Sequence, residues 1–272
     1  MIKLADTHCH TEYSHDSSAN FDEVILGAIA KGLSSITITD HCDTELDHEV
    51  EIPKSVASYI RTERAKEKYA DRIKVLSGAE ICYAVGYEQY GRELESLCPN
   101  IDQVIYSVHC LVHEGKITPY SKLDFSNFTQ KQIDDYLMLY FETVKKSLDA
   151  RGNILPHLTC PYRYIKFRYG KKINESLYEP IIKEILDTAI ERNIALEINT
   201  SGFVSGAGMQ PDEWMIKYYL DNGGKMITLG ADAHIPANIG AGFEKVVAVL
   251  KKLGVNSVYR FEKRKPVEIK FD

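Results

Sequence analysis

Six of the nine histidines in this 272-residue chain stand at the carboxyl ends of short apolar runs. Each run has the length and composition of a buried β-strand. The histidines at these run ends are His8, His10, His41, His109, His157 and His234. Because the carboxyl ends of parallel strands converge on one face of an α/β barrel, we expect these imidazoles to lie close together.

The apolar runs alternate with helical stretches, and we count seven strand–helix units rather than eight. This pattern predicts the α/β class and a distorted (β/α)7 TIM-like barrel, with its site at the carboxyl ends of the strands. We expect a single domain over residues 1–272. A doubly wound open sheet is the structural alternative, but the ends of seven strands do not converge on one spot there.

Local signals predict several elements between the strands. Asn20 is expected to cap a helix, and residues 130–150 have the apolar spacing of an amphipathic helix. Three polar stretches are expected as loops on the active face: residues 42–53, residues 113–129, which have the length of a lid, and the basic, aromatic residues 160–172. The tail from Ser257 is expected to form a β-hairpin.

The bulk composition narrows the class of partner and the compartment. A net charge of −6 argues against a nucleic-acid partner. No segment approaches the roughly 18 apolar residues of a membrane span, and the first residues lack the apolar stretch of a signal peptide. The six cysteines form no CxxC pair, which favours a reducing cytoplasm. The oligomeric state stays open.

The first and last strands carry histidine pairs with the same spacing. His8 and His10 are two residues apart on one strand, so their imidazoles share a face about 6 to 7 Å apart, which suits one cation. Asp232 and His234 repeat this spacing on the last strand, which lies beside the first in a closed barrel. Glu80 ends the third strand, where its carboxylate could bridge two metals.

A single histidine at a strand end is usually a structural hydrogen-bonding group, and that role predicts scattered positions. Six of them at equivalent strand ends, interleaved with carboxylates, indicate a metal cluster instead. The set is too large for one zinc ion and sufficient for two or three metals.

The motifs DTHCH, TDH, GAE, SVH and GADAH together resemble the PHP (polymerase and histidinol phosphatase) family of metal phosphoesterases. The resemblance runs from Asp6 to about Leu253. The compact size and the segment EINTSG are most similar to the family's monofunctional histidinol-phosphate phosphatases. The resemblance implies a distorted (β/α)7 barrel with a trinuclear site of zinc, manganese or iron.

The resemblance also implies which residues hold the metals, with Glu80 bridging two of them. The three implied groups are His8, His10, Glu80 and Asp232; then Glu80, His109 and His157; and then Asp16, His41 and His234. His15 replaces Asp16 if the chain bulges locally.

We hypothesise a phosphomonoesterase in which a metal-bridging hydroxide attacks the phosphorus of a phosphate ester. The resemblance implies that this ester is L-histidinol phosphate. Either Asp232 or His234 accepts the proton from the nucleophile. Arg163, six residues after His157, is expected to bind the phosphate.

Further residues are expected around the substrate. Asn199 and Ser201 are expected to line the pocket, with hydrogen bonding at the strand end as the alternative. Asp43, or else Glu12 or Glu45, could bind the cationic histidinol group. Asp40 is expected to support a ligand from behind rather than bind metal.

Three other functional readings stay open. A PHP site could act on a nucleotide, an oligonucleotide 3′ end or phosphotyrosine; an exonuclease should show a basic groove, which the acidic charge balance disfavours. An amidohydrolase barrel also begins with HxH but usually bridges its metals with a lysine, where this chain has Glu80. A non-catalytic metal-binding module should lack a ligand, and none is visibly missing.

Overall fold

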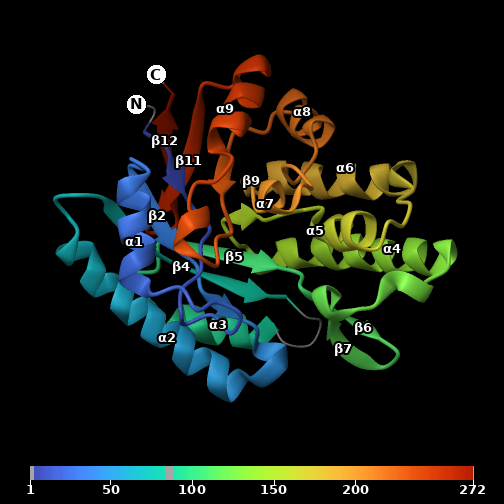
Figure 1. The fold of residues 1–272 in the computed structure, drawn as a ribbon, viewed down its shortest axis with the longest axis horizontal. Coiled ribbons are helices and arrows are strands. Elements are labelled where there is room, and N and C mark those ends of the chain that lie inside the picture. The colour runs from blue at the N-terminus through green and yellow to red at the C-terminus, as the bar shows by residue number, and fades with distance from the viewer. Residues whose placement is uncertain (1–2, 84–87, 272) are drawn as a thin grey trace.

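The computed structural model describes residues 3–83 and 88–271, with the side chains of residues 44–46 outside that description. Seven parallel strands form one curved sheet, with helices packed around it (Figure 1). In spatial order the strands are β1 (Ala5–Asp6), β2 (Ser35–Ile38), β4 (Lys74–Cys82), β5 (Gln103–Ser107), β8 (Ile154–Leu155), β9 (Ala195–Asn199) and β10 (Ile227–Gly230). The short strand β3 (His41–Cys42) pairs with the end of β4.

The sheet closes between its first and last strands. Cys9 and Ala233 form a parallel bridge just beyond β1 and β10, and the Thr7 N–H donates to the Leu229 carbonyl at 2.9 Å. Gln103 on β5 donates its side-chain amide to the Thr7 carbonyl at 2.6 Å, although β5 and β1 are not neighbours in the sheet. The predicted barrel is therefore confirmed, and the open doubly wound sheet is wrong.

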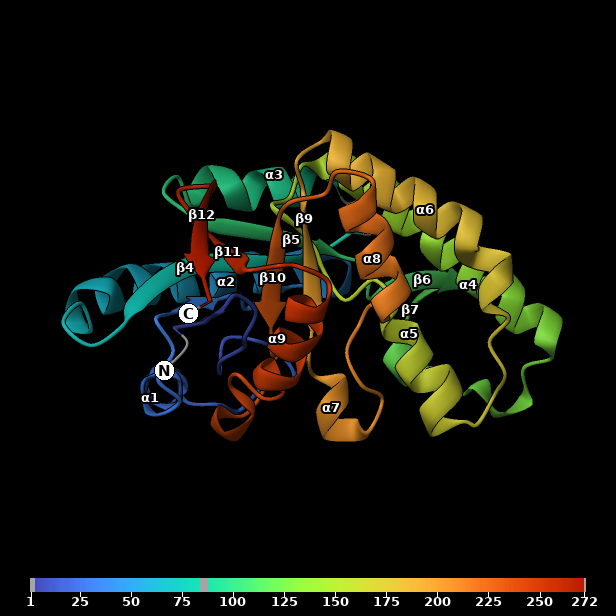
Figure 2. The same cartoon turned by 90° about the horizontal axis from the view of Figure 1, so that it is seen from above.

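Helices cover the outer face of the barrel, and α4 and α6 pack side by side (Figure 2). The longer helices are α1 (Phe21–Ala30), α2 (Thr44–Lys68), α3 (Glu88–Leu97), α4 (Gln130–Ser147), α6 (Glu175–Glu191), α8 (Glu213–Asp221) and α9 (Phe243–Lys252). The Asn20 side chain accepts the Asp22 and Glu23 N–H groups and so caps α1, as predicted.

The apolar side of α4 follows the helical period predicted for residues 130–150. Ile133, Leu137, Phe141 and Val144 are all buried between this helix and the barrel. Thr129 and Gln132 form a capping box at its first turn, which satisfies backbone donors that the helix leaves free. Leu148–Ala150 continue the helix as one 3₁₀ turn.

Three stretches expected as loops contain regular structure. Residues 42–53 belong mostly to α2, with a backbone break at Asp47. Residues 113–129 include part of the hairpin of β6 (Cys110–His113) and β7 (Lys116–Pro119), followed by 3₁₀ turns.

Residues 160–172 begin with the short helix α5 (Cys160–Tyr162) and a π-helical turn over Arg163–Arg168. The basic side chains on this turn suggested a loop, but Tyr162 and Ile165 are buried and tie it to the core.

The predicted tail hairpin is present as β11 (Ser257–Glu262) and β12 (Lys265–Lys270), which pair antiparallel. Among the described residues, no helix is both long enough and apolar enough to cross a bilayer.

Candidate metal centre

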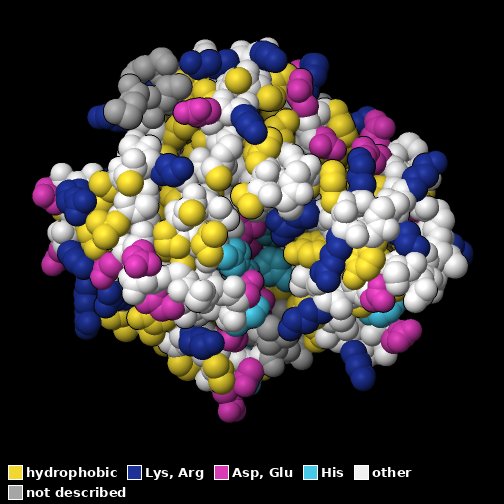
Figure 3. All heavy atoms as spheres, in the orientation of Figure 1, with side chains coloured by type: hydrophobic (Ala, Val, Ile, Leu, Met, Phe, Trp, Pro, Cys, Tyr) yellow, Lys and Arg dark blue, Asp and Glu magenta, His cyan; other side chains and the backbone are white. Residues whose placement is uncertain are grey.

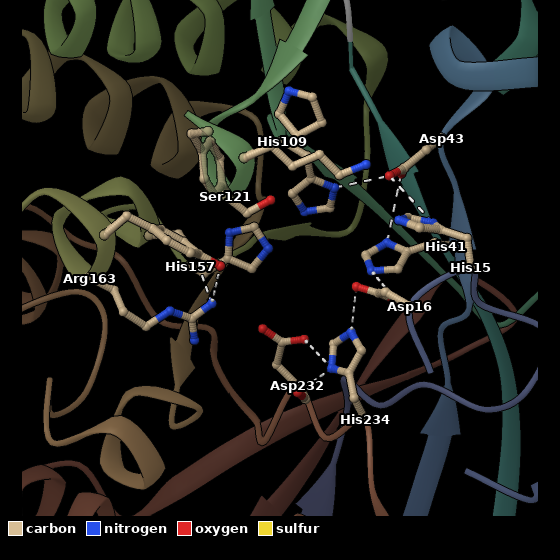
Figure 4. Close-up of a pocket in the computed structure, with 15 residues that line it drawn as sticks. His15, Asp16, His41, Asp43, His109, Ser121, His157, Arg163, Asp232 and His234 are labelled. Carbon is tan, nitrogen blue, oxygen red and sulfur yellow. Dashed lines mark hydrogen bonds and ion pairs between the residues drawn. The ribbon is translucent and has the colours of Figure 1, made fainter. Parts of the chain in front are cut away.

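The carboxyl ends of the strands surround a hollow in which histidine and acidic side chains gather (Figure 3). The labelled imidazoles and carboxylates face one central space, with Arg163 on the side opposite Asp43 (Figure 4). Of the nine side chains expected to hold metal, those lining the cavity are Asp16, His41, His109, His157, Asp232 and His234. His8, His10 and Glu80 lie buried beneath them.

Glu80, on β4, lies at the centre of the cluster and is 1% exposed. One carboxylate oxygen is 3.1 Å from His8 Nε2, 3.4 Å from His10 Nε2 and 3.1 Å from His41 Nδ1. The other is 3.2 Å from His109 Nε2 and 2.8 Å from His157 Nε2, and it also accepts the Ser107 hydroxyl. Its two oxygens therefore face two groups of imidazoles, as a bridging ligand would.

The last strand completes the cluster from the side of β1. Asp232 Oδ1 lies 3.2 Å from His10 Nε2 and 3.8 Å from His8 Nε2. Asp232 has a backbone φ of 50°, a left-handed conformation that is uncommon outside glycine, and it turns the chain at this point. Gly230 is required two residues before it, because a Cβ there would overlap a Glu197 carboxylate oxygen.

Asp16 lies between two imidazoles, with its oxygens 3.5 Å from His41 Nε2 and 3.2 Å from His234 Nε2. His15 instead faces Asp43, with 3.9 Å between His15 Nδ1 and Asp43 Oδ2. The geometry at this corner therefore favours Asp16 over His15 as the residue that shares a cation with His41 and His234.

Asp43 lines the cavity but is almost completely buried. Its Oδ1 atom lies 3.7 Å from His41 Nδ1 and 3.6 Å from His109 Nδ1. Glu12 is exposed, and the side chain of Glu45 lies outside the described residues. Of the three acids considered for the substrate, Asp43 is the one placed in the cavity wall.

The charges in the cluster stabilise one another. Burial alone would raise the pKa of Glu80, but the imidazoles of His8, His109 and His41 lower it well below its usual value. Burial would lower the pKa of His41, yet Asp43 and Glu80 raise it to about 9. His10 is the exception: burial and the neighbouring His234 and His41 lower its pKa to about 3.

Several buried polar atoms of the cluster have no hydrogen-bond partner among the residues that the structure describes. They are His8 Nε2, His10 Nε2, His41 Nδ1, His157 Nδ1, Asp43 Oδ1 and Glu80 Oε2. Leaving such atoms unsatisfied is costly, and a cation would satisfy them. Four overlapping triplets bring ligand atoms within 4.8 Å of one another, so the residues fit metal ions with nitrogen and oxygen ligands.

A second layer of side chains fixes the orientation of the imidazoles. The His8 Nδ1–H donates to Glu197 at 2.7 Å, which leaves Nε2 facing Glu80. Ser14 Oγ lies 3.1 Å from His10 Nδ1 and donates to Asp40 at 2.8 Å, so Asp40 supports this imidazole through Ser14.

Sequence reasoning missed Glu197 and Ser14. The available signal for Glu197 was the alternation along β9, which places it on the same inward face as Asn199.

The three residues expected to contact substrate beside β9 form a hydrogen-bonded chain. Arg163 lines the cavity and donates to Ser201 Oγ at 2.9 Å. Ser201 donates its backbone N–H and its hydroxyl to Asn199 Oδ1 at 3.0 and 2.6 Å. Asn199 in turn donates to Glu197 at 3.2 Å and is fully buried. It therefore lies behind the cavity wall and supports Ser201 and Arg163, as its hydrogen-bonding alternative had suggested.

A further cation that the sequence did not single out reaches the same cavity. Lys122 lies on the 3₁₀ turn Tyr120–Lys122, directly after the β6–β7 hairpin, and lines the cavity together with Ser121. The Tyr120 N–H donates to the His109 carbonyl at 3.1 Å, which holds this turn against the end of β5.

Comparison with known proteins finds one matching family model and several similar proteins. A family model described as the PHP domain matches residues 6–201. A protein of Thermotoga maritima named "Probable histidinol-phosphatase" is 31% identical over 251 residues, or 92% of each chain. The "Histidinol-phosphatase" of Lactococcus lactis subsp. lactis is 27% identical over 265 residues, which cover 96% of this chain and 95% of the relative.

The fold also matches a solved structure. A crystal structure of the histidinol phosphate phosphatase of Lactococcus lactis subsp. lactis, complexed with zinc, L-histidinol and phosphate, superposes with a TM-score of 0.79 at 24% identity. The match covers 98% of this chain and 100% of that chain. Because the family model spans well over half of the sequence, this chain belongs to the PHP domain family.

Proposed function

We propose that this protein is a metal-dependent phosphomonoesterase that hydrolyses L-histidinol phosphate to L-histidinol and phosphate, a step of histidine biosynthesis. The observation that carries the hydrolytic chemistry is Glu80, whose buried carboxylate faces five imidazoles with its two oxygens. The choice of substrate rests on the names of relatives that align over more than nine-tenths of the chain.

We assign two or three divalent ions of zinc, manganese or iron to the nine candidate ligands. Bound there, such ions lower the pKa of water to supply hydroxide and neutralise the oxygens of a phosphate group. His8, His10 and Asp232 would hold one ion together with Glu80. His109 and His157 would hold a second ion, which the other Glu80 oxygen would face. Asp16, His41 and His234 would hold the outermost ion.

The chain's own side chains bind the substrate and move protons. Arg163 offers its guanidinium to the phosphate, held in place by Ser201. Asp232 and His234 line the cavity and can take up a proton from the nucleophile or return it to the leaving group. Asp43, on the side opposite Arg163, supplies negative charge for the cationic end of histidinol (Figure 4).

We further propose that residues 1–272 work as one domain on a small molecule, rather than on a nucleic acid or a membrane. A cytoplasmic location suits the cysteines, because the sequence has no CxxC pair and all six are buried.

The test is steady-state phosphate release from L-histidinol phosphate, with AMP and phosphotyrosine in parallel, on protein whose metals have been counted. We expect a kcat/KM of about 10⁴ M⁻¹ s⁻¹ or more for histidinol phosphate, far above the other two. Comparable slow rates on all three would reject this substrate while keeping phosphoester hydrolysis. No release from any of them by the metal-loaded protein would reject the hydrolytic function itself.

A further inference from the structure

A second cavity opens at the opposite end of the barrel, where β8, β9 and β10 begin. It has a volume of about 820 Å³, within the usual range for small-molecule sites. Three arginines line it, Arg151, Arg192 and Arg264, together with the apolar side chains of Ile194 and Phe261. The metal centre lies at the other ends of the same strands, so this cavity is a separate place in the molecule.

The arginines give this cavity a positive charge that nearby carboxylates offset only in part. Arg192 pairs with Asp149 at 2.6 Å, and Arg264 pairs with Glu95 at 2.8 Å. Arg264 also donates to the backbone carbonyl of Arg151 at 2.8 Å, which fixes its guanidinium at the wall.

The third guanidinium, that of Arg151, differs from the other two in its contacts. Across residues 3–83 and 88–271, the Arg151 side chain has no recorded hydrogen bond or ion pair, so its charge is available to a ligand.

The backbone at Arg151 has a conformation that disfavours residues with a side chain. Arg151 follows a helical turn with a φ of 59°, in the left-handed region that favours glycine. The turns that lead into β2 and β10 use Gly32 and Gly223 in that conformation. An arginine at such a position is more strained than a glycine and contributes no recorded contact of its guanidinium to the fold.

The rest of the wall indicates the kind of molecule that would fit. The half-buried Met226 and the exposed Pro266 give the wall an apolar surface, and Ile194 and Phe261 lie nearly fully buried beneath it. A guanidinium is a planar fork of donors that matches the two oxygens of a carboxylate or a phosphoryl group. An apolar surface beside such forks suits a ligand with a hydrocarbon or aromatic body and one anionic end.

We propose that this cavity is a second ligand site, which binds a small aromatic or apolar anion through Arg151, Arg192 and Arg264. Its anionic group is a carboxylate or a phosphoryl group, held by the guanidinium of Arg151. The site is independent of the proposed phosphatase activity, because no residue that lines it also lines the metal centre.

Calorimetric titration with phenylphosphonate, whose P–C bond a phosphomonoesterase does not cleave, tests the proposal, with benzoate as the carboxylate probe. The informative variant is Arg151→Gln, because that side chain has no recorded partner whose loss would unfold the protein. Arg64→Gln, an exposed arginine on α2, is the matched control, and Arg163→Gln removes the guanidinium at the metal centre.

We expect one saturable binding event with at least one probe that persists in Arg163→Gln and Arg64→Gln. In Arg151→Gln it should weaken at least about tenfold, while phosphate release is unchanged. The probe that binds more tightly identifies the anionic group. Equal affinity in Arg151→Gln and the unmodified protein would overturn the proposal. Loss of all binding in Arg163→Gln, or no saturable binding of either probe below about 10 mM, would overturn it as well.

Discussion

Glu197 orients several side chains of the site, although it does not itself line the cavity. Its carboxylate is fully buried and accepts the His8 Nδ1–H at 2.7 Å and the His157 backbone N–H at 2.8 Å. It also accepts the amide of Asn199, which leads through Ser201 to Arg163. One carboxylate thus orients a candidate metal ligand and supports the candidate phosphate-binding arginine.

Replacing Glu197 by Gln should weaken metal binding about 10- to 100-fold. A glutamine amide has one oxygen, so its NH₂ group would face either the His8 Nδ1–H or the two donors of His157 and Asn199. Competition with a chromophoric chelator measures the affinity, and the exposed Glu12→Gln is the control. Equal affinities for both variants and the unmodified protein would show that Glu197 has no such role.

Substitution of Arg163 tests phosphate binding separately from the integrity of the metal centre. Arg163→Gln should lower kcat/KM about 10²- to 10³-fold, because it removes donors from the charged phosphate oxygens. The kcat/KM of Arg163→Lys should lie between those of the Gln variant and the unmodified protein. An ammonium keeps the positive charge but lacks the paired N–H donors of a guanidinium. Phosphate release and metal content are measured together. A Gln variant that keeps both its metals and its full activity would exclude this residue from phosphate binding.

At the scale of elements, local sequence signals predicted the strands, α4 and the tail hairpin, because each has its own periodicity. The stretches 42–53 and 160–172 were misread as loops because they are rich in polar residues, whereas buried apolar residues such as Ile52 and Ile165 attach them to the core. The role of Glu197 was not predicted for a different reason. Its partner His8 is 189 residues away in the sequence, and no local sequence pattern predicts such a contact. The positions of the strand ends predicted which candidate ligands lie close together. They did not predict which side chains orient those ligands.

The predicted capping of α1 by Asn20 can be tested by substitution. Asn20→Ala should lower the free energy of unfolding by about 1 kcal/mol, because the Asp22 and Glu23 N–H groups lose their acceptor. Asn20→Asp should retain most of this stability, since a carboxylate caps a helix equally well and its negative charge is stabilised at the helix N-terminus. Urea denaturation at constant metal load measures both. If the Asp variant lost as much stability as the Ala variant, the cap would not be the cause.

For the whole molecule, closure of the barrel is what assembles the site. The bridge between Cys9 and Ala233 sets the first and last strands side by side, so that Asp232 and His234 meet His10. Ions bound at this face would tie together strand ends that are far apart in sequence. Their binding free energy would therefore add to the stability of the folded barrel.

Removing the metals with a chelator should consequently lower the Tm, and adding zinc back should restore it. Removal of the ions would leave buried atoms such as His8 Nε2 and Glu80 Oε2 without a partner, which destabilises the folded state. Differential scanning calorimetry at one protein concentration measures the shift. A Tm that stays the same after the metals have been removed, with the loss checked by elemental analysis, would mean that the cluster does not bind ions tightly to the native state.

We propose that Glu80 bridges a centre of more than one metal ion. The most direct measurement is the metal-to-protein ratio by plasma mass spectrometry, after equilibration with zinc, manganese or iron(II) and desalting. We predict two or three ions per chain in the unmodified protein and fewer in Glu80→Gln, because a neutral amide cannot bridge two cations. One ion or none in the unmodified protein, or an equal count in both proteins, would show that Glu80 does not bridge metal ions.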